Sequence, residues 1–148
     1  MDDLSELKAL FVSQKLAVLA TQSHGQPHGS LVAFAVSDDF ANLVFATDRD
    51  TRKYHDIRMN PRVAMLIDSR SNRETDFVET LAVTVHGNAR EAEGKERDQC
   101  RRLYLAKHPY LAEFIDRPST ALIKVQVKDY LAATFRKTWV VRPPESAV

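Results

Sequence analysis

The sequence predicts a mainly β fold: a small closed barrel of about six antiparallel strands with helices inserted at two or three points. Short apolar runs separated by turn residues recur along the chain, and residues 81–90 alternate strictly between two faces. The length of 148 residues is that of one ordinary domain. Six strands in so short a chain favour a closed barrel, because closure removes the unpaired strand edges.

The first third of the chain predicts a helix followed by three strands. A helix is expected over residues 3–12, where apolar residues recur at helical spacing: Leu4, Leu7, Leu10 and Phe11. This stripe would lie on the barrel or on a partner subunit. Strands are expected over 16–22, 28–37 and 42–47. The first two would form a hairpin with a loop of about five residues at 23–27.

The middle of the chain predicts a helix over residues 51–60. Asp50 or Thr51 is its expected N-cap, and Pro61 prevents its continuation. The apolar run 63–68 predicts a strand buried on both faces, and 69–76 is a polar loop. Because a helix separates the third strand from the fourth, these two strands need not be hairpin neighbours.

The remainder of the chain predicts a long strand, helices and a final pair of strands. The long strand is expected over 77–92, with a bulge or bend at Gly87. Helices should follow at 94–107 and 110–115, the first with Cys100, Leu103 and Tyr104 on one face. Strands should cover 120–135 and 138–141. We expect one domain over 1–142 and a flexible tail over 143–148, which holds Pro143-Pro144.

Composition restricts the classes of function. The net charge of +1 does not favour bulk binding to nucleic acid or to an anionic membrane. No apolar run approaches the roughly 20 residues of a membrane span, and the N-terminus lacks the features of a signal peptide. With Cys100 as its single cysteine, the chain cannot form an internal disulfide, which fits a cytoplasmic setting.

The stretch from Thr47 to Val63 predicts a phosphate-binding turn. Thr47, Thr51, Arg52 and Lys53 cluster where a strand passes into a helix. A helix N-terminus presents free N–H groups and a partial positive charge, and the two basic side chains add full charges. The alternative is a solvated basic helix with a threonine N-cap.

The other candidate side chains favour structural roles. His24, His28, His86 and His108 have no carboxylate or thiol at metal-ligand spacing, so no metal site is expected. His55, on the basic helix, is the strongest exception, since a neutral histidine can be an axial haem ligand. Cys100 is expected to be a small buried hydrophobe. No catalytic residue can be assigned from spacing.

Several segments, in this order, resemble the pyridoxamine 5′-phosphate oxidase-like, FMN-binding split-barrel family. They are LAVLAT, GSLVAFAV, NLVFATDRDTRKYHDIRMNPRVAMLID and VTVHGNAR, and the resemblance covers about residues 5–135. Its most specific part is the T-x-x-x-T-R-K turn with the later N-P-R-V. The resemblance implies a split β-barrel with a Greek-key-like strand order.

The resemblance also implies a cofactor site. The flavin phosphate would lie on Arg52 and Lys53, with Thr47 and Thr51 close by. The strand segment Ser30, Leu31, Val32 and Ala33 would run along the isoalloxazine ring through its backbone. A homodimer would carry two cofactors at its interface. FMN is the expected cofactor, and a deazaflavin or haem is the alternative.

The sequence departs from the family at the substrate end. Ala82 stands where members that oxidise pyridoxamine phosphate often carry Gln, and RKTWVVRPP lacks their C-terminal Arg-and-His motif. This argues against that vitamin oxidase activity. Asn72 is a candidate cofactor contact, and Trp139 is either core packing or a lid over the partner's flavin. The expected function is a flavin-dependent oxidoreductase acting on an unknown small molecule, with a non-enzymatic flavin or haem carrier or sensor as the alternative.

Overall fold

A computed structural model describes residues 3–144 and confirms the mainly β barrel. The strands are β1 (Leu16–Ser23), β2 (Gln26–Val36), β3 (Asn42–Asp48), β4 (Arg62–Asp68), β5 (Ala82–Glu91), β6 (Thr120–Ala133) and β7 (Thr138–Val141). The helices are α1 (Asp3–Ser13), α2 (Arg52–Met59), α3 (Asp76–Glu79), α4 (Gly94–Lys107) and α5 (Ala112–Ile115), with a 3₁₀ turn, η1 (Pro109–Leu111), before α5.

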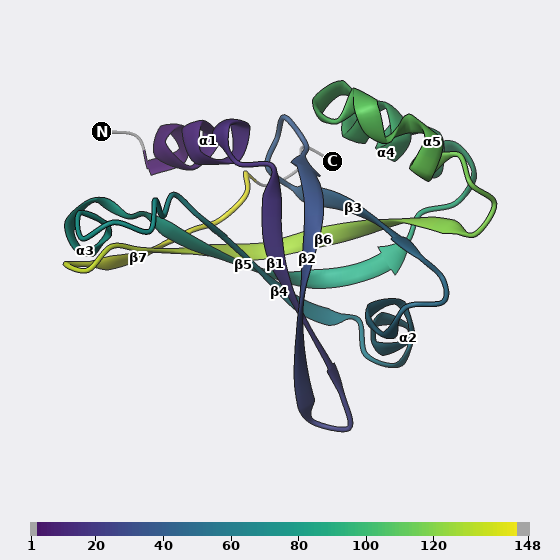
Figure 1. The fold of residues 1–148 in the computed structure, drawn as a ribbon, viewed down its shortest axis with the longest axis horizontal. Helices are drawn as coiled ribbons and strands as arrows, with labels where there is room; N and C mark the ends of the chain where they lie inside the picture. The colour runs from purple at the N-terminus through teal and green to yellow at the C-terminus, as the bar shows by residue number, and fades with distance from the viewer. Residues whose placement is uncertain (1–2, 145–148) are drawn as a thin grey trace.

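Six of the strands close into a barrel. Their order is β3-β2-β1-β4-β5-β6, and β3 also pairs with β6, while β7 extends the sheet beyond β6. The first three strands form a meander, and β4 returns to lie beside β1, which is the Greek-key order. Strands β3 and β4, whose pairing the sequence left open, are not neighbours. Figure 1 shows the far end of the β1–β2 hairpin projecting beside α2, with α3 and β7 on the opposite side of the molecule.

The barrel interior holds one large apolar core that includes Leu19, Phe34, Phe45, Met65 and Val85. Helix α1 closes one end of it with the apolar stripe predicted from its spacing, since Leu7, Leu10 and Phe11 are buried. The Phe11 ring lies 5.7 Å from that of Tyr130 and 5.8 Å from that of Phe34. Of the two predicted locations for this stripe, the structure therefore shows the barrel.

A second, smaller core lies under α4 and α5, on the outer face of β3. Val44, Ala46 and Leu122 pack there against Cys100 and Tyr104 of α4. This explains why β3 is apolar on both faces: one face lines the barrel and the other is covered by helices (Figure 1).

Three predicted boundaries were wrong. Residues 76–79 form helix α3, so β5 begins at Ala82 and not at residue 77. The β1–β2 loop is a tight turn with His24 and Gly25 at its tip, not a five-residue loop, and both residues have positive φ. Two successive positive-φ residues match the twist of a hairpin, which lets pairing continue to Ser23 and Gln26. Strand β6 ends at Ala133 and not at residue 135.

The predicted irregularity at Gly87 is confirmed as a β-bulge. The β5–β6 register shifts between His86 and Gly87. A Cβ atom on Gly87 would lie 2.4 Å from the Gln126 carbonyl oxygen, so the close approach of the two strands requires glycine.

The division into a domain over 1–142 and a flexible tail over 143–148 stays a prediction, and residues 145–148 lie outside the described range. No helix within residues 3–144 combines the length and apolar character needed to cross a membrane.

Candidate functional site

The candidate site lies where strands β2 and β3 separate. They pair only through Phe34, Ala35 and Val36 of β2, and Phe34↔Phe45 is the last pair. Beyond it, Ser30–Ala33 keeps its pairing with β1, but its other edge has no strand partner among residues 3–144. Strand β3 meanwhile continues along β6 to Asp48. We call the region between Ser30–Ala33 and Thr47–Lys53 the split.

Both groups of predicted cofactor residues therefore flank one opening of the barrel. Thr47 follows the last β2–β3 pair by two residues, and helix α2 begins four residues after Asp48. The unpaired edge of Ser30–Ala33 supplies free backbone groups on the other side of the split.

The predicted threonine pair is assembled at this turn. The Thr47 and Thr51 hydroxyl oxygens lie 2.7 Å apart, and the Thr51 hydroxyl donates to the Asp48 carbonyl at 2.8 Å. Thr51 is the N-cap of α2, and its Oγ1 accepts from the Tyr54 backbone N–H at 3.4 Å. Thr47 is buried, so in the absence of a ligand its main role is to stabilise the turn through these hydrogen bonds.

The basic residues of the stretch divide into engaged and free groups. Arg49 is held by Glu91, with Nη2 2.6 Å from Oε2, and it donates from Nη1 to the Pro118 carbonyl. Glu91 also accepts from the Tyr54 hydroxyl at 2.7 Å, and these hydrogen bonds, that from Arg49 first, lower its pKa. By contrast, the side chains of Arg52 and Lys53 have no hydrogen bond or ion pair with any described residue. Two full positive charges thus remain available at the helix N-terminus.

The sequence alone did not reveal the Glu91–Tyr54 contact that secures α2. Tyr54 stands inside the basic stretch, but its partner lies 37 residues away, at the end of β5. Only the barrel register brings them together, so spacing along the chain could not indicate the pair.

The four predicted residues of β2 alternate between two environments. Val32 is buried in the barrel, Ala33 is half-buried and Leu31 is 66% exposed. The hydroxyl oxygen of Ser30 is buried and has no hydrogen-bond partner in the structure. Ser30 lies opposite Leu19, on the face where the neighbouring Thr21 hydroxyl donates to the Asp56 carboxylate of α2 at 2.8 Å. An unpaired buried hydroxyl beside α2 and the split is a polar group that a ligand could satisfy.

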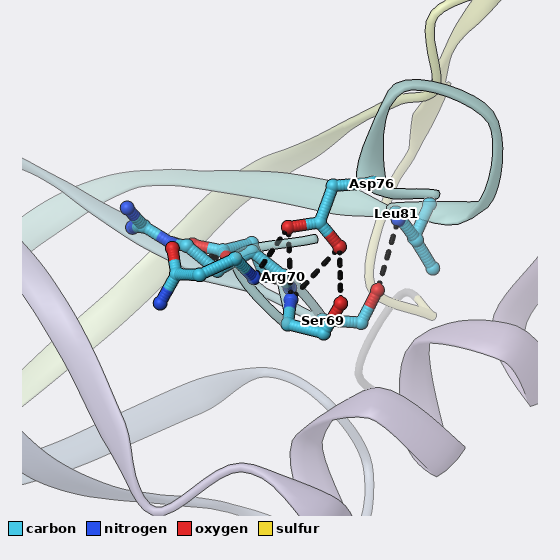
Figure 2. Close-up of polar contacts among 7 residues, drawn as sticks. Ser69, Arg70, Asp76 and Leu81 are labelled. Carbon is cyan, nitrogen blue, oxygen red and sulfur yellow. Dashed lines mark hydrogen bonds and ion pairs between the residues drawn. The ribbon is translucent and has the colours of Figure 1, made fainter. Parts of the chain in front are cut away.

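The predicted contact Asn72 is not beside the split of its own chain. It lies in the loop between β4 and α3, on the opposite side of the molecule from α2 (Figure 1). The Asp76 carboxylate closes this loop by accepting from the Ser71 and Asn72 backbone N–H groups at 2.8 and 2.7 Å, and Figure 2 shows it facing the turn. On the other side of the loop, the Ser69 hydroxyl accepts from the Leu81 N–H at 3.0 Å. Asn72 is thereby held with φ at 63°.

Near this end of the sheet, the indole Nε1 of Trp139 is buried without a hydrogen-bond partner in the structure. Phe77 of α3 and Phe135 of the β6–β7 turn are both mostly exposed, and their rings lie 5.4 Å apart. Trp139 packs at the edge of the barrel core, and the Lys137 ammonium lies over its ring.

The remaining candidates occupy structural or solvated positions. Cys100 lies on the buried face of α4, and burial raises the pKa of its thiol. His108 is fully buried, with Nε2 2.8 Å from the Phe34 carbonyl oxygen, and burial lowers its pKa. His55 is exposed on α2 and its ring lies near that of Tyr54.

A Greek-key barrel with a separated strand pair and a basic helix N-terminus at the separation defines a class of small split-barrel proteins. The family model for pyridoxamine 5′-phosphate oxidase matches residues 4–132. The chain belongs to this family.

Among its relatives, the chain is 32% identical to a 5a,11a-dehydrotetracycline/5a,11a-dehydrooxytetracycline reductase of Streptomyces rimosus. The match runs over 93 residues, which are 59% of this chain and 63% of the reductase. The chain spans between 33% and 63% of the length of the three curated relatives it matches.

Solved structures share the fold at low sequence identity. A haem-binding protein from Mycobacterium smegmatis superposes with a TM-score of 0.84 at 18% identity, covering 96% of this chain and 58% of that one. An FAD-binding protein from Mesorhizobium loti superposes with a TM-score of 0.70 at 17% identity, covering 88% and 92%.

Proposed function

We propose that this chain is an FMN-binding flavoprotein that acts as an oxidoreductase on a small molecule. The observation that carries the proposal is the pair of free basic side chains, Arg52 and Lys53, on the first turn of a helix at the split. Phosphate is attracted to helix N-termini, and Arg52 can bind phosphate oxygens in a bidentate manner. The family and the S. rimosus reductase support an oxidoreductase.

The residues at the split fit a phosphorylated flavin. Arg52 and Lys53 would hold the phosphate, and Thr47 and Thr51 would fix the turn that presents them. The unpaired Ser30 hydroxyl would form a hydrogen bond with the ligand. The backbone N–H and C=O groups on the open edge of Ser30–Ala33 would contact the ring. When bound, the flavin supplies the electron-transfer chemistry, while the chain binds and orients it. This is consistent with a sequence in which no catalytic residue is evident.

A homodimer with the cofactor at its interface is part of the proposal. The β4–α3 loop that carries Asn72 lies on the opposite side of the molecule from α2 (Figure 1), so Asn72 would reach a flavin at the split only from a second copy. The outer face near the start of β1 and the adjoining part of β2, away from the hairpin end, is apolar, with Leu16 and Leu31 exposed. Burying such a face is favourable by about 25 cal/mol per Å². The proposed setting is the cytoplasm.

The absorbance spectrum of the purified protein tests the cofactor directly. A flavin band, or uptake of added FMN, is expected. If the protein is colourless and does not take up FMN, the proposal fails. Bleaching of a bound flavin by NADH or NADPH is expected of an oxidoreductase, whereas a carrier would not be reduced at a catalytic rate.

Lys53→Ala tests the phosphate contact. It should weaken FMN binding by about tenfold or more, which corresponds to one charge-assisted hydrogen bond, with the fold unchanged. Lys95→Ala removes the same charge from the exposed start of α4 and is the matched control. Equal FMN affinity of both variants, measured by fluorescence titration, would place the phosphate elsewhere.

A haem- or flavin-binding carrier is the second candidate. It is favoured by His55, which is exposed on α2, and by the fold shared with the M. smegmatis haem-binding protein. A Soret band that His55→Ala abolishes would support haem. A deazaflavin would be distinguished from FMN by the spectrum of the extracted cofactor.

A further inference from the structure

The β5–β6 bulge turns an additional side chain outward. His86 pairs with Asp129, and Gly87 pairs with Val127, so Lys128 is an extra residue on β6 with no partner on β5. Both Lys128 and Asp129 consequently project toward the outer face, beside His86. Bulges re-aim side chains in this way and are common beside binding sites.

A cavity of about 850 Å³ lies next to this bulge, and we call it the bulge cavity. Its polar lining comes from four strands: Thr21 and Gln22 of β1, Arg62 of β4, His86 and Asn88 of β5, and Lys128 and Asp129 of β6. Arg62 follows the C-terminal end of α2, whereas the proposed flavin phosphate site is at its N-terminal end. The bulge cavity is therefore separate from the split.

Most polar side chains around the bulge cavity are unpaired. Gln22, Arg62, Asn88 and Lys128 make no side-chain hydrogen bond or ion pair with another residue in the range 3–144. They line one cavity from four strands and form no hydrogen bonds with one another. This differs from Arg49, Arg90 and Arg101, each of which is held by a carboxylate.

A hydrogen bond within the lining orients the His86 side chain. Its Nδ1 lies 2.7 Å from Asp129 Oδ1, and the His86 side chain is 44% exposed. A carboxylate at this distance makes Nδ1 the donor, which fixes the orientation of the ring. The other ring nitrogen, Nε2, is then left to meet a ligand.

The charges in the bulge cavity favour an anion. Arg62 and Lys128 are free cations, and Asp129, already engaged with His86, is the only carboxylate among the lining residues. The nearby Asp56 carboxylate is buried on α2 and accepts from the Thr21 hydroxyl. Two cationic side chains that lack a partner, with no free carboxylate beside them, are suited to bind an oxyanion.

We propose that the bulge cavity binds a small molecule through a carboxylate or phosphate group, with Arg62 and Lys128 as its cationic donors and His86 beside them. Asp129 positions His86, and the Asn88 and Gln22 amides of the lining add neutral donors. This is a second binding site, distinct from the proposed flavin site and independent of whether a flavin binds.

The proposal is tested by two-dimensional ¹H–¹⁵N NMR with inorganic phosphate and succinate as probes, at constant ionic strength held with NaCl. Saturable shifts are expected for the amides of residues 86–88 and 128–129. Tighter binding of phosphate would assign a phosphate ester as the ligand group, and tighter binding of succinate a carboxylate. The same shifts are expected in Lys53→Ala, because that variant removes only the flavin phosphate contact.

Matched variants identify the donors. Arg62→Gln and Lys128→Gln should each weaken the binding of the better probe by about tenfold, the loss of one charge-assisted hydrogen bond. Lys95→Gln, on the exposed start of α4, should change it by less than about twofold, as expected for a distant exposed charge. His86→Gln should weaken binding, whereas NaCl alone should cause no saturable shift.

The proposal is overturned if residues 86–88 and 128–129 do not respond, as they would not if a second copy of the chain covered the bulge cavity. It is also overturned if Lys95→Gln weakens binding as much as Lys128→Gln. Shifts confined to residues 51–54, and lost in Lys53→Ala, would support the flavin phosphate site and contradict this second site.

Discussion

Ser30 shows how one unpaired atom can indicate a ligand. Its hydroxyl is buried without a partner, which costs stability in the chain alone. Ser30→Ala should therefore leave the stability of the flavin-free protein unchanged or raise it by about 1 kcal/mol. The same variant should bind FMN more weakly, because the hydroxyl satisfied by the ligand is gone. Urea unfolding and FMN titration measure the two effects.

Ser37→Ala is the control for Ser30. It removes a hydroxyl from the β2–β3 turn, where Ser37 donates to the Asp39 carboxylate at 2.7 Å. It should lower stability slightly and leave FMN affinity unchanged. Equal loss of FMN affinity in both variants would contradict a specific role for Ser30.

Thr51 should matter first for stability. Its side chain caps α2 and joins Thr47, so Thr51→Ala should lower the free energy of unfolding by about 1 kcal/mol. Thr51→Ser keeps the hydroxyl and should retain most of that stability. Thermal unfolding of the two variants checks the comparison, and identical melting temperatures would contradict the capping role.

Asp76 should titrate unusually low. Hydrogen bonds, first the one from the Ser71 backbone N–H, lower its pKa to about 2 from an ordinary value of 3.8. Because the pKa of Asp76 is lower in the folded state than in the unfolded state, its hydrogen bonds stabilise the folded loop above pH 3.8. This stabilisation is lost as the pH falls through about 2. The Ser71 and Asn72 amide resonances should report a midpoint near 2. A midpoint near 3.8 would mean that the loop is not closed by Asp76.

At the level of the elements, the β5–β6 bulge depends on Gly87. Gly87→Ala places a Cβ atom against the Gln126 backbone, which cannot move aside as a flexible side chain could. We expect a loss of about 2 kcal/mol or more in urea unfolding. In Gly29→Ala the new Cβ would have its nearest neighbour at 4.0 Å, so that variant should be close to neutral. A neutral Gly87→Ala would mean that the strands can separate at the bulge.

The elements that sequence patterns identified are those with a strong local signal. Thr51 and Pro61 marked the limits of α2, and the alternation around Val83 and Val85 marked β5. Helix α3 was missed because it is one turn long and buries none of its residues. The tight turn at His24 was missed because positive φ at a histidine is uncommon and has no clear sequence signature.

At the scale of the whole molecule, the proposed homodimer makes Leu31 an interface residue. Leu31→Glu should shift the protein from about twice its chain mass of 16.8 kDa toward a single chain. Val12→Glu alters another highly exposed apolar side chain, on α1, and should leave the mass unchanged. Light scattering after size-exclusion chromatography measures both. A wild-type protein that elutes as a single chain would contradict the dimer.

The sequence could indicate which residues flank the split, but not the contacts that join distant segments. The cluster of Thr47, Thr51, Arg52 and Lys53 was enough to predict a phosphate-binding turn, and the family resemblance added the strand segment Ser30–Ala33. The partners Glu91 for Arg49 and Asp129 for His86 are each about forty residues away and depend on the register of β5 and β6. Register follows from the closed barrel and its bulge, which no single segment specifies.

Strand β6 has a consequence for how the protein is made. It pairs with β3 on one side and β5 on the other, so it is the last strand needed to close the barrel. On the ribosome, every strand from β1 to β5 emerges before it, and β3 must wait for a partner that begins some seventy residues later. Until then two strand edges remain open to other nascent chains. A chain truncated before Thr120 should therefore aggregate, and closure by β6 should be the slow step of folding.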